Sequence, residues 1–144
     1  MVNYFMAKIP NQKNPYFQRF IAFMHSIDNG KSIVGDWNLI EKTSDENSDK
    51  IISHLIDLAC NTQNIGNINI GRCFLLKSPK DWLMKRLRPL INGFLINGDY
   101  WNYIRMLELL STIDYSLTKE VAEKAVLHKN LEIQEVGKDY LINL

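Results

Sequence analysis

The stretch Asp99–Asn143 reads DYWNYIRMLELLSTIDYSLTKEVAEKAVLHKNLEIQEVGKDYLIN. Apolar side chains recur in it at every third or fourth residue, which is the spacing of one helix face. Asp99, Thr118 and Asn130 stand where the pattern restarts, and short polar side chains favour the position before a helix. The pattern therefore predicts helices at 100–113, 119–129 and 130–143. Because connections of a few residues make neighbouring helices antiparallel, we expect stacked helical hairpins.

The preceding part of the chain carries the same kinds of signal. Asn14 before Pro15, and Ser78 before Pro79, are helix starts with proline at the first helical position. Asp36 is expected to cap a short helix that carries Trp37. Further helices are predicted at 45–61 and 79–97, whereas Gly30–Gly35 and Asn61–Gly71 read as connections. The sequence thus predicts one all-α domain that spans residues 1–144.

Pro89 lies inside the strong helical pattern of residues 79–97. A proline there removes one backbone donor, and its ring clashes with the preceding turn. We therefore expect either two helical pieces or one kinked helix.

Composition excludes several classes of protein. A hydrophobic share of 46% and a charged share of 23% are ordinary for a folded domain, and a net charge of +1 gives no overall attraction to nucleic acid or anionic lipid. The apolar part of Met1–Pro10 is too short for an export signal, and no apolar run is long enough to cross a membrane. Cys60 and Cys73 lack a paired spacing, which favours buried free thiols and a cytoplasmic location.

No motif for a nucleotide-binding loop, a nucleophilic serine or a zinc-binding helix occurs. His25, His54 and His128 stand at no metal-ligand spacing from one another or from a cysteine. The sequence therefore predicts a protein that is not an enzyme, with no catalytic residues, no metal, no cofactor and no small-molecule substrate.

The segment 77–88 concentrates basic side chains beside Trp82, namely Lys77, Lys80, Lys85, Arg86 and Arg88. Such a pattern suits phosphate contacts with base stacking, so a nucleic-acid-binding helical module is the alternative function. A solvated helix face explains the same residues better, because the total charge is close to zero.

The candidate partner-binding face lies in the C-terminal part, where residues 99–144 hold eight acidic and five basic side chains. In the helix after Asp99, the apolar residues leave one side free, and tryptophan and arginine on such a side are typical of binding hot spots. A tryptophan in the first turn of a helix can equally lie over the surface of its neighbour. The last helix presents a stripe of three carboxylates, which ordinary solvation explains more often and for which a basic partner is the alternative. The face comprises Trp101, Arg105, Glu108, Glu132, Glu135 and Asp139.

The segment Lys129–Leu141, KNLEIQEVGKDYL, resembles the second helix of a HEAT-type repeat. Glu132-Ile133-Gln134 occupies the acidic-apolar-basic triplet of that pattern, with Gln134 where arginine is usual, and Val136-Gly137 occupies its small-residue positions. Tyr103-Ile104-Arg105 stands in the same register twenty-nine residues earlier, and Pro89 resembles the kinking proline of a first helix.

This resemblance implies a HEAT-like stack of helix pairs over residues 79–144, with an extended binding surface and no catalytic residue. Small all-α proteins of this kind, rich in residues with AT-rich codons, resemble immunity proteins encoded beside secreted or contact-dependent bacterial toxins. The implied partner is a toxin domain, which the helical face neutralises by covering its active site.

Overall fold

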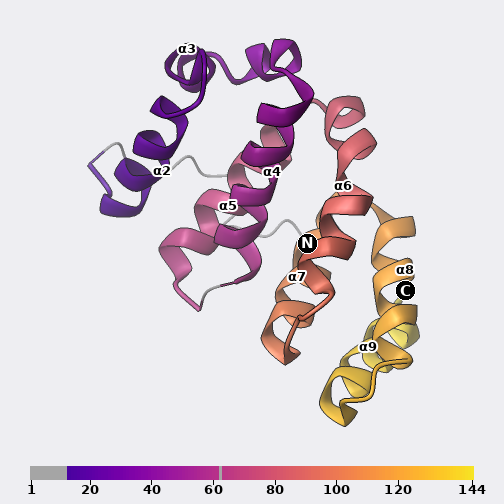
Figure 1. The fold of residues 1–144 in the computed structure, drawn as a ribbon. Helices are drawn as coiled ribbons and strands as arrows, with labels where there is room; N and C mark the ends of the chain where they lie inside the picture. Colours follow the sequence, from indigo (N-terminus) through magenta and orange to yellow (C-terminus); the bar gives the residue numbers. More distant parts are fainter. Residues whose placement is uncertain (1–12, 62) are drawn as a thin grey trace. The chain divides into compact units, whose positions relative to one another are not determined.

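The computed structural model describes residues 13–61 and 63–144, and their regular structure is entirely helical (Figure 1). They form eight α-helices and one 3-10 helix, and no β-strand occurs among them. The order is α2 (Pro15–His25), α3 (Gly30–Gly35), η1 (Trp37–Lys42), α4 (Asp45–Cys60), α5 (Ile65–Lys77), α6 (Lys80–Leu95), α7 (Tyr100–Ile113), α8 (Tyr115–Val126) and α9 (Leu131–Asn143). The predicted all-α fold of helical hairpins is confirmed. The prediction about Met1–Pro10 lies outside the described residues.

The helices gather into two compact units, one that ends at Leu90 and one that runs from Ile91 to Leu144. The boundary falls inside α6, between Leu90 and Ile91. Since this division does not say whether the units unfold together, a single domain over residues 1–144 stays a prediction.

An aromatic cluster forms the core of the first unit, in which α5 packs against α2 and α4. The ring of Phe74 lies 4.6 Å from that of Phe20 and 4.7 Å from that of Trp37, measured between centroids. The indole N–H of Trp37 donates to the Ser78 hydroxyl over 3.0 Å. That hydroxyl in turn donates to the Phe74 carbonyl over 2.6 Å, so the one polar group of the tryptophan is satisfied inside the core.

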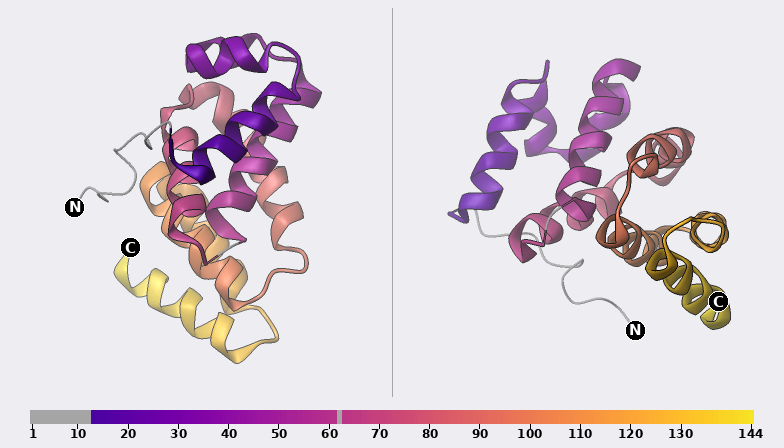
Figure 2. Two further views of the ribbon diagram at one scale, coloured as in Figure 1. Left: turned by 90° about the vertical axis from the view of Figure 1, so that its left-hand side faces the viewer. Right: turned by 60° about the horizontal axis from the view of Figure 1, so that its bottom comes forward.

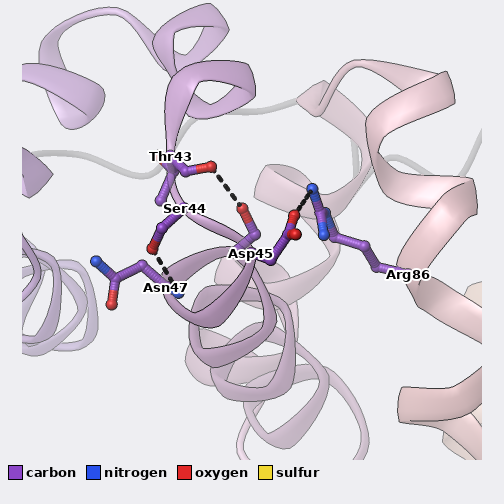
Figure 3. A network of polar contacts seen from close by, with 6 residues as sticks. Thr43, Ser44, Asp45, Asn47 and Arg86 are labelled. Atoms are coloured by element: carbon purple, nitrogen blue, oxygen red, sulfur yellow. Dashed lines mark hydrogen bonds and ion pairs between the residues drawn. The ribbon is translucent and has the colours of Figure 1, made fainter.

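Polar contacts fix the start of α4 (Figure 3). The Ser44 hydroxyl accepts from the Asn47 amide at 3.2 Å, and the Ser48 hydroxyl donates to the Thr43 carbonyl at 3.4 Å. An Asp45 carboxylate oxygen lies 2.9 Å from Nη2 of Arg86 on α6. The backbone amides at the start of a helix have no partner within the helix, and the Ser44 hydroxyl supplies one here. The Asp45–Arg86 ion pair joins α4 to the first half of α6.

In the second unit, α7 packs against both helices of the α8–α9 hairpin. Figure 2 shows α8 and α9 joined by a short turn. Asp99 caps α7 reciprocally with Asn102, because each side chain accepts from the other residue's amide at 2.9 Å. Asp114 caps α8 and Asn130 caps α9. The buried residues of α7, Tyr103, Met106, Leu107, Leu109 and Leu110, confirm that this helix is covered by its neighbours.

The prediction of a loop over Asn61–Gly71 is wrong, because Asn64 caps α5 and the helix continues to Lys77. The glycines there allow close contacts instead of ending the helix. The Tyr16 ring lies where a Cβ of Gly66 would stand, and the backbone of Leu55 and Ala59 takes that place at Gly71. Glycine thus lets α5 approach α2 and α4, and most of its circumference is buried.

Gly30–Gly35, predicted as a connection, forms the short helix α3, and the helix predicted from Pro15 ends at His25. Asn29 supplies the change of direction with a left-handed φ of 62°. A Cβ at Gly30 would stand 1.6 Å from the Met24 carbonyl oxygen, so this tight turn excludes any side chain there.

Two helix starts differ from their predicted positions. Thr118 does not cap a helix at 119–129, because α8 already begins after Asp114. Thr118 is buried within α8, and its hydroxyl donates to the Asp114 carbonyl over 2.7 Å. At α6 the first backbone bond runs from the Leu83 amide to the Pro79 carbonyl, so Pro79 takes the position predicted for Ser78.

α6 runs unbroken from Lys80 to Leu95 with Pro89 inside it, so the predicted alternative of two separate helices is wrong. Pro89 has no amide proton to donate to the carbonyl one turn before it. Because Pro89 is exposed, water can donate the hydrogen bond to that carbonyl instead. A kink at this position stays a prediction.

Candidate functional site

Three of the predicted site residues form one contiguous cluster on α7, which we call the Trp101 cluster (Trp101, Arg105 and Glu108). The Arg105 guanidinium carbon lies 5.8 Å from the centroid of the Trp101 ring. Nη1 of the same side chain donates to a Glu108 carboxylate oxygen at 2.8 Å. The Tyr100 ring meets the Trp101 indole edge to face at 5.2 Å. The indole is therefore held between a cation and a second ring.

Trp101 remains 48% exposed although it lies in the first turn of α7. Arg105 and Glu108 are largely covered, with side chains 21% and 31% exposed. A large, ordered and open aromatic side chain beside an oriented arginine has the character of a hot spot, because little conformational freedom is lost when a partner covers it.

The other three predicted residues, Glu132, Glu135 and Asp139, are all exposed on α9, as expected. A carboxylate oxygen of Glu135 lies 3.6 Å from the Lys138 ammonium nitrogen. This pair is mostly solvated, and such surface pairs contribute little to stability. The stripe therefore presents net negative charge on the outer side of the last helix.

The residues of this stripe can be compared with the residues of α7 that stand twenty-nine positions earlier in the sequence. Glu132, Glu135 and Asp139 each stand twenty-nine residues after an apolar residue of α7, and those residues are Tyr103, Met106 and Leu110. All three are buried, and the Tyr103 ring meets His128, in the α8–α9 turn, at 5.5 Å. The three positions that are buried and apolar in α7 thus correspond to exposed carboxylates in α9.

In the basic segment 77–88, the side chains of Trp82 and Arg86 contribute to the packing of the fold. Trp82 is only 6% exposed, so its ring cannot stack on a base. Arg86 is bound to Asp45 at 2.9 Å, and its guanidinium carbon lies 5.6 Å from the centroid of the Trp82 ring. The nucleic-acid alternative is left with exposed Lys77, Lys80, Lys85 and Arg88.

A second polar site, which the sequence analysis did not identify, lies on α4. An open hollow of about 530 Å³ is lined by Phe23, Glu46, Asp49, Lys50, Ser53, His54 and Asp57. The His54 imidazole stacks on the Phe23 ring, with centroids 3.8 Å apart and planes 8° from parallel. The six α4 residues share one helix face, which their spacing indicates, but only folding brings Phe23 of α2 to them.

The ionisable groups of this hollow are perturbed by their surroundings. Burial lowers the pKa of His54 below its ordinary value, and the nearby Asp57 carboxylate opposes that effect. Burial likewise raises the pKa of Asp57, against the opposing influence of His54. Each group therefore favours its neutral form more than it does in water.

Cys60 and Cys73 are buried free thiols, as predicted. Among the described residues, no three His, Cys, Asp or Glu side chains converge as ligands of a metal ion. None of the helices in residues 13–61 and 63–144 has the length and hydropathy required to cross a membrane.

No family model, curated protein or solved structure matches this chain.

Proposed function

We propose that this protein binds another protein through the Trp101 cluster and acts without catalysis. The observation that carries the proposal is the ordered exposure of Trp101, held by Arg105, whose guanidinium is in turn bound by Glu108. A folded monomer gains nothing from leaving a tryptophan open to water, whereas an interface gains a large rigid contact.

Charge supports a basic partner. The second unit carries eight acidic and five basic side chains, and the stripe on α9 is exposed. Negative potential over the unit would attract a positively charged surface and speed its association. Because a stripe of carboxylates is also ordinary for a solvated helix face, the proposal rests on the Trp101 cluster first.

For the partner we propose a bacterial toxin domain, which makes this chain its immunity protein. The support is the resemblance of residues 79–144 to HEAT-type helix pairs, together with a small all-α fold that offers a binding face. The mechanism is steric, since a helix face seated over the toxin's active site excludes its substrate. If the toxin cleaves nucleic acid, the carboxylates of α9 take the place of the phosphates.

The experiment begins with the gene next to the one that encodes this chain. Its product, or its C-terminal domain, is produced in bacteria with and without the chain, and growth is measured. Rescue by the wild-type chain and loss of rescue with Trp101→Ala are expected. Ser53→Ala, at an exposed position on α4, is the matched control and is expected to rescue.

Two results contradict the proposal at different levels. Full rescue and unchanged affinity with Trp101→Ala, Arg105→Ala and Glu108→Ala would place the interface elsewhere. Catalytic turnover by the isolated chain would contradict the proposal that it is a binding protein without catalytic activity. Salt-sensitive binding of single-stranded DNA that depends on Lys80 and Lys85 would favour the nucleic-acid alternative instead.

A further inference from the structure

A second and more enclosed hollow lies in the first unit, between α3 and η1, which pack against each other. Figure 1 shows these two elements following α2 along the chain, before α4 begins. The hollow has a volume of about 230 Å³ and is lined by Asn29, Ser32, Ile33, Leu39, Lys42 and Thr43. This volume lies below the range of about 300–1,000 Å³ for drug-sized ligands, so any occupant must be small.

The hollow combines an apolar floor with a polar rim. Ile33 is 2% exposed, and Leu39 is half-buried beside it. The polar residues of the lining are Asn29, Ser32, Lys42 and Thr43; the first three are exposed and Thr43 is half-buried. Small-molecule sites commonly have this composition, in which apolar walls bind the body of a ligand and a few polar groups orient it.

The polar side chains of the rim are not engaged by the rest of the described chain. Asn29 stands at the N-cap of α3, but its side chain makes no capping hydrogen bond. The Ser32 and Thr43 hydroxyls donate no hydrogen bond, and Lys42 forms no ion pair, within the described residues. These groups differ from Asn14, Ser44 and Asp99, whose side chains are consumed by the helix ends that they cap.

The charge of the rim is positive. Lys42 is the ionised residue among the six that line the hollow. The acidic residues nearest in sequence are not among the lining residues, and the Asp36 carboxylate is occupied by the Asn38 amide at 3.2 Å. An anionic group in the hollow would therefore meet one ammonium, two hydroxyls and an amide.

We propose that this hollow binds a small organic carboxylate with a compact apolar body. The carboxylate pairs with the Lys42 ammonium and accepts from the Ser32 and Thr43 hydroxyls, while the apolar body covers Ile33 and Leu39. A charge-assisted bond and the burial of one small apolar group support a dissociation constant of about 1 mM. The site is independent of the Trp101 cluster and adds a ligand to a protein proposed to bind another protein.

The test titrates the full chain with benzoate and follows the methyl resonances of Ile33 and Leu39 by NMR. Benzyl alcohol, which has the same ring without the charge, is the matched ligand. Lys42→Met removes the charge and keeps most of the stem, whereas Lys31→Met removes an exposed charge on α3 outside the hollow. Amide spectra of both variants verify that the fold is kept.

Benzoate is expected to cause saturable shifts of these methyl resonances. Lys42→Met is expected to bind benzoate about three- to tenfold more weakly, and Lys31→Met is expected to bind it as the wild-type protein does. Benzyl alcohol is expected to bind more weakly by a similar factor. The proposal is overturned if benzoate causes no saturable shift at these methyls. It is also overturned if benzyl alcohol binds as well, or if both lysine variants weaken benzoate binding equally.

Discussion

Gly137 of α9 lies directly against the backbone of Ala122 in α8. A Cβ at position 137 would stand 2.6 Å from the Ala122 carbonyl oxygen and 2.8 Å from the Val126 amide nitrogen. Gly71 of α5 has the same relationship to α4, where a Cβ would stand 2.5 Å from the Leu55 carbonyl oxygen. Each hairpin therefore closes at a point where one helix carries no side chain.

Gly137→Ala is expected to destabilise the protein by about 2 kcal/mol, because backbone atoms cannot yield as a flexible side chain would and the helices must separate. Chemical denaturation measures the change. Gly93→Ala is the control, since nothing lies within 4 Å of a Cβ at this position on α6. The control is expected to stabilise by about 1 kcal/mol through helix propensity, and equal losses in both variants would refute the close-contact argument.

Ser78→Ala is expected to cost about 1–3 kcal/mol. The substitution leaves the buried Trp37 indole N–H without its acceptor, and an unsatisfied buried donor loses its full solvation. Thermal and chemical unfolding measure the loss. Ser53→Ala, at an exposed helical position, is expected to change stability by less than about 0.5 kcal/mol. A neutral Ser78→Ala would show that water reaches the indole.

The free energy of unfolding is expected to fall as the pH drops below about 6.5, the ordinary pKa of histidine. Burial lowers the pKa of His54 in the folded protein, so the unfolded chain binds the proton more tightly and acid favours unfolding. Asp57 has the opposite effect, which begins at lower pH. Its raised pKa means that stability decreases as the pH rises from its ordinary value of 3.8.

His54→Phe keeps an aromatic ring against Phe23 and removes the titration. Unfolding measured between pH 5 and pH 7 is therefore expected to show a smaller slope in this variant than in the wild-type protein. The assignment fails if the slope is the same in His54→Phe and the wild type.

Placing the α7 residues on α9 is expected to make the protein self-associate. The triple variant Glu132→Tyr, Glu135→Met, Asp139→Leu gives the last helix the apolar face that α7 buries. Light scattering with size-exclusion chromatography is expected to report a larger, concentration-dependent mass. Replacement by Gln, Gln and Asn removes charge without apolar surface and is expected to keep the wild-type mass. An unchanged mass in both variants would show that apolar side chains at these positions of α9 do not create an interface.

Trp101→Ala is expected to weaken binding to the cognate partner by about 2 kcal/mol or more, close to thirtyfold in the dissociation constant. Calorimetry measures the affinity, and circular dichroism verifies the fold. Unchanged affinity would show that the indole is not in the interface.

Reversal of Glu132 and Glu135 to Lys is expected mainly to slow association with a basic partner and to flatten its salt dependence. Stopped-flow measurements at two salt concentrations separate this effect from a change in dissociation. Faster association of the reversed variant would mean that the partner surface is acidic.

Local signals in the sequence were sufficient for the fold class and for several helix starts. Asn14, Asp36, Asp99 and Asn130 cap helices as predicted, because a cap depends only on a side chain and the amides two or three residues after it. The outward positions of Trp101 and of the α9 carboxylates also followed from helical spacing, since a helix fixes which residues share a side.

The errors fall where contacts between helices decide the outcome. Gly66 and Gly71 resemble loop residues when the sequence is read alone. Both lie in α5, where each leaves room for atoms of a neighbouring helix. The hollow at His54 likewise depends on Phe23, which is thirty-one residues away in the chain. No local rule connects such positions, because the neighbour is supplied by packing.

Trp82 and Trp101 separate the two kinds of information. Periodicity and capping place each of them in the first turn of an amphipathic helix, because both are properties of a few consecutive residues. The difference in exposure, 6% for Trp82 and 48% for Trp101, arises from the packing of the helices. Burial depends on whether another segment covers the side chain, and that cover comes from residues whose distance along the chain carries no signal.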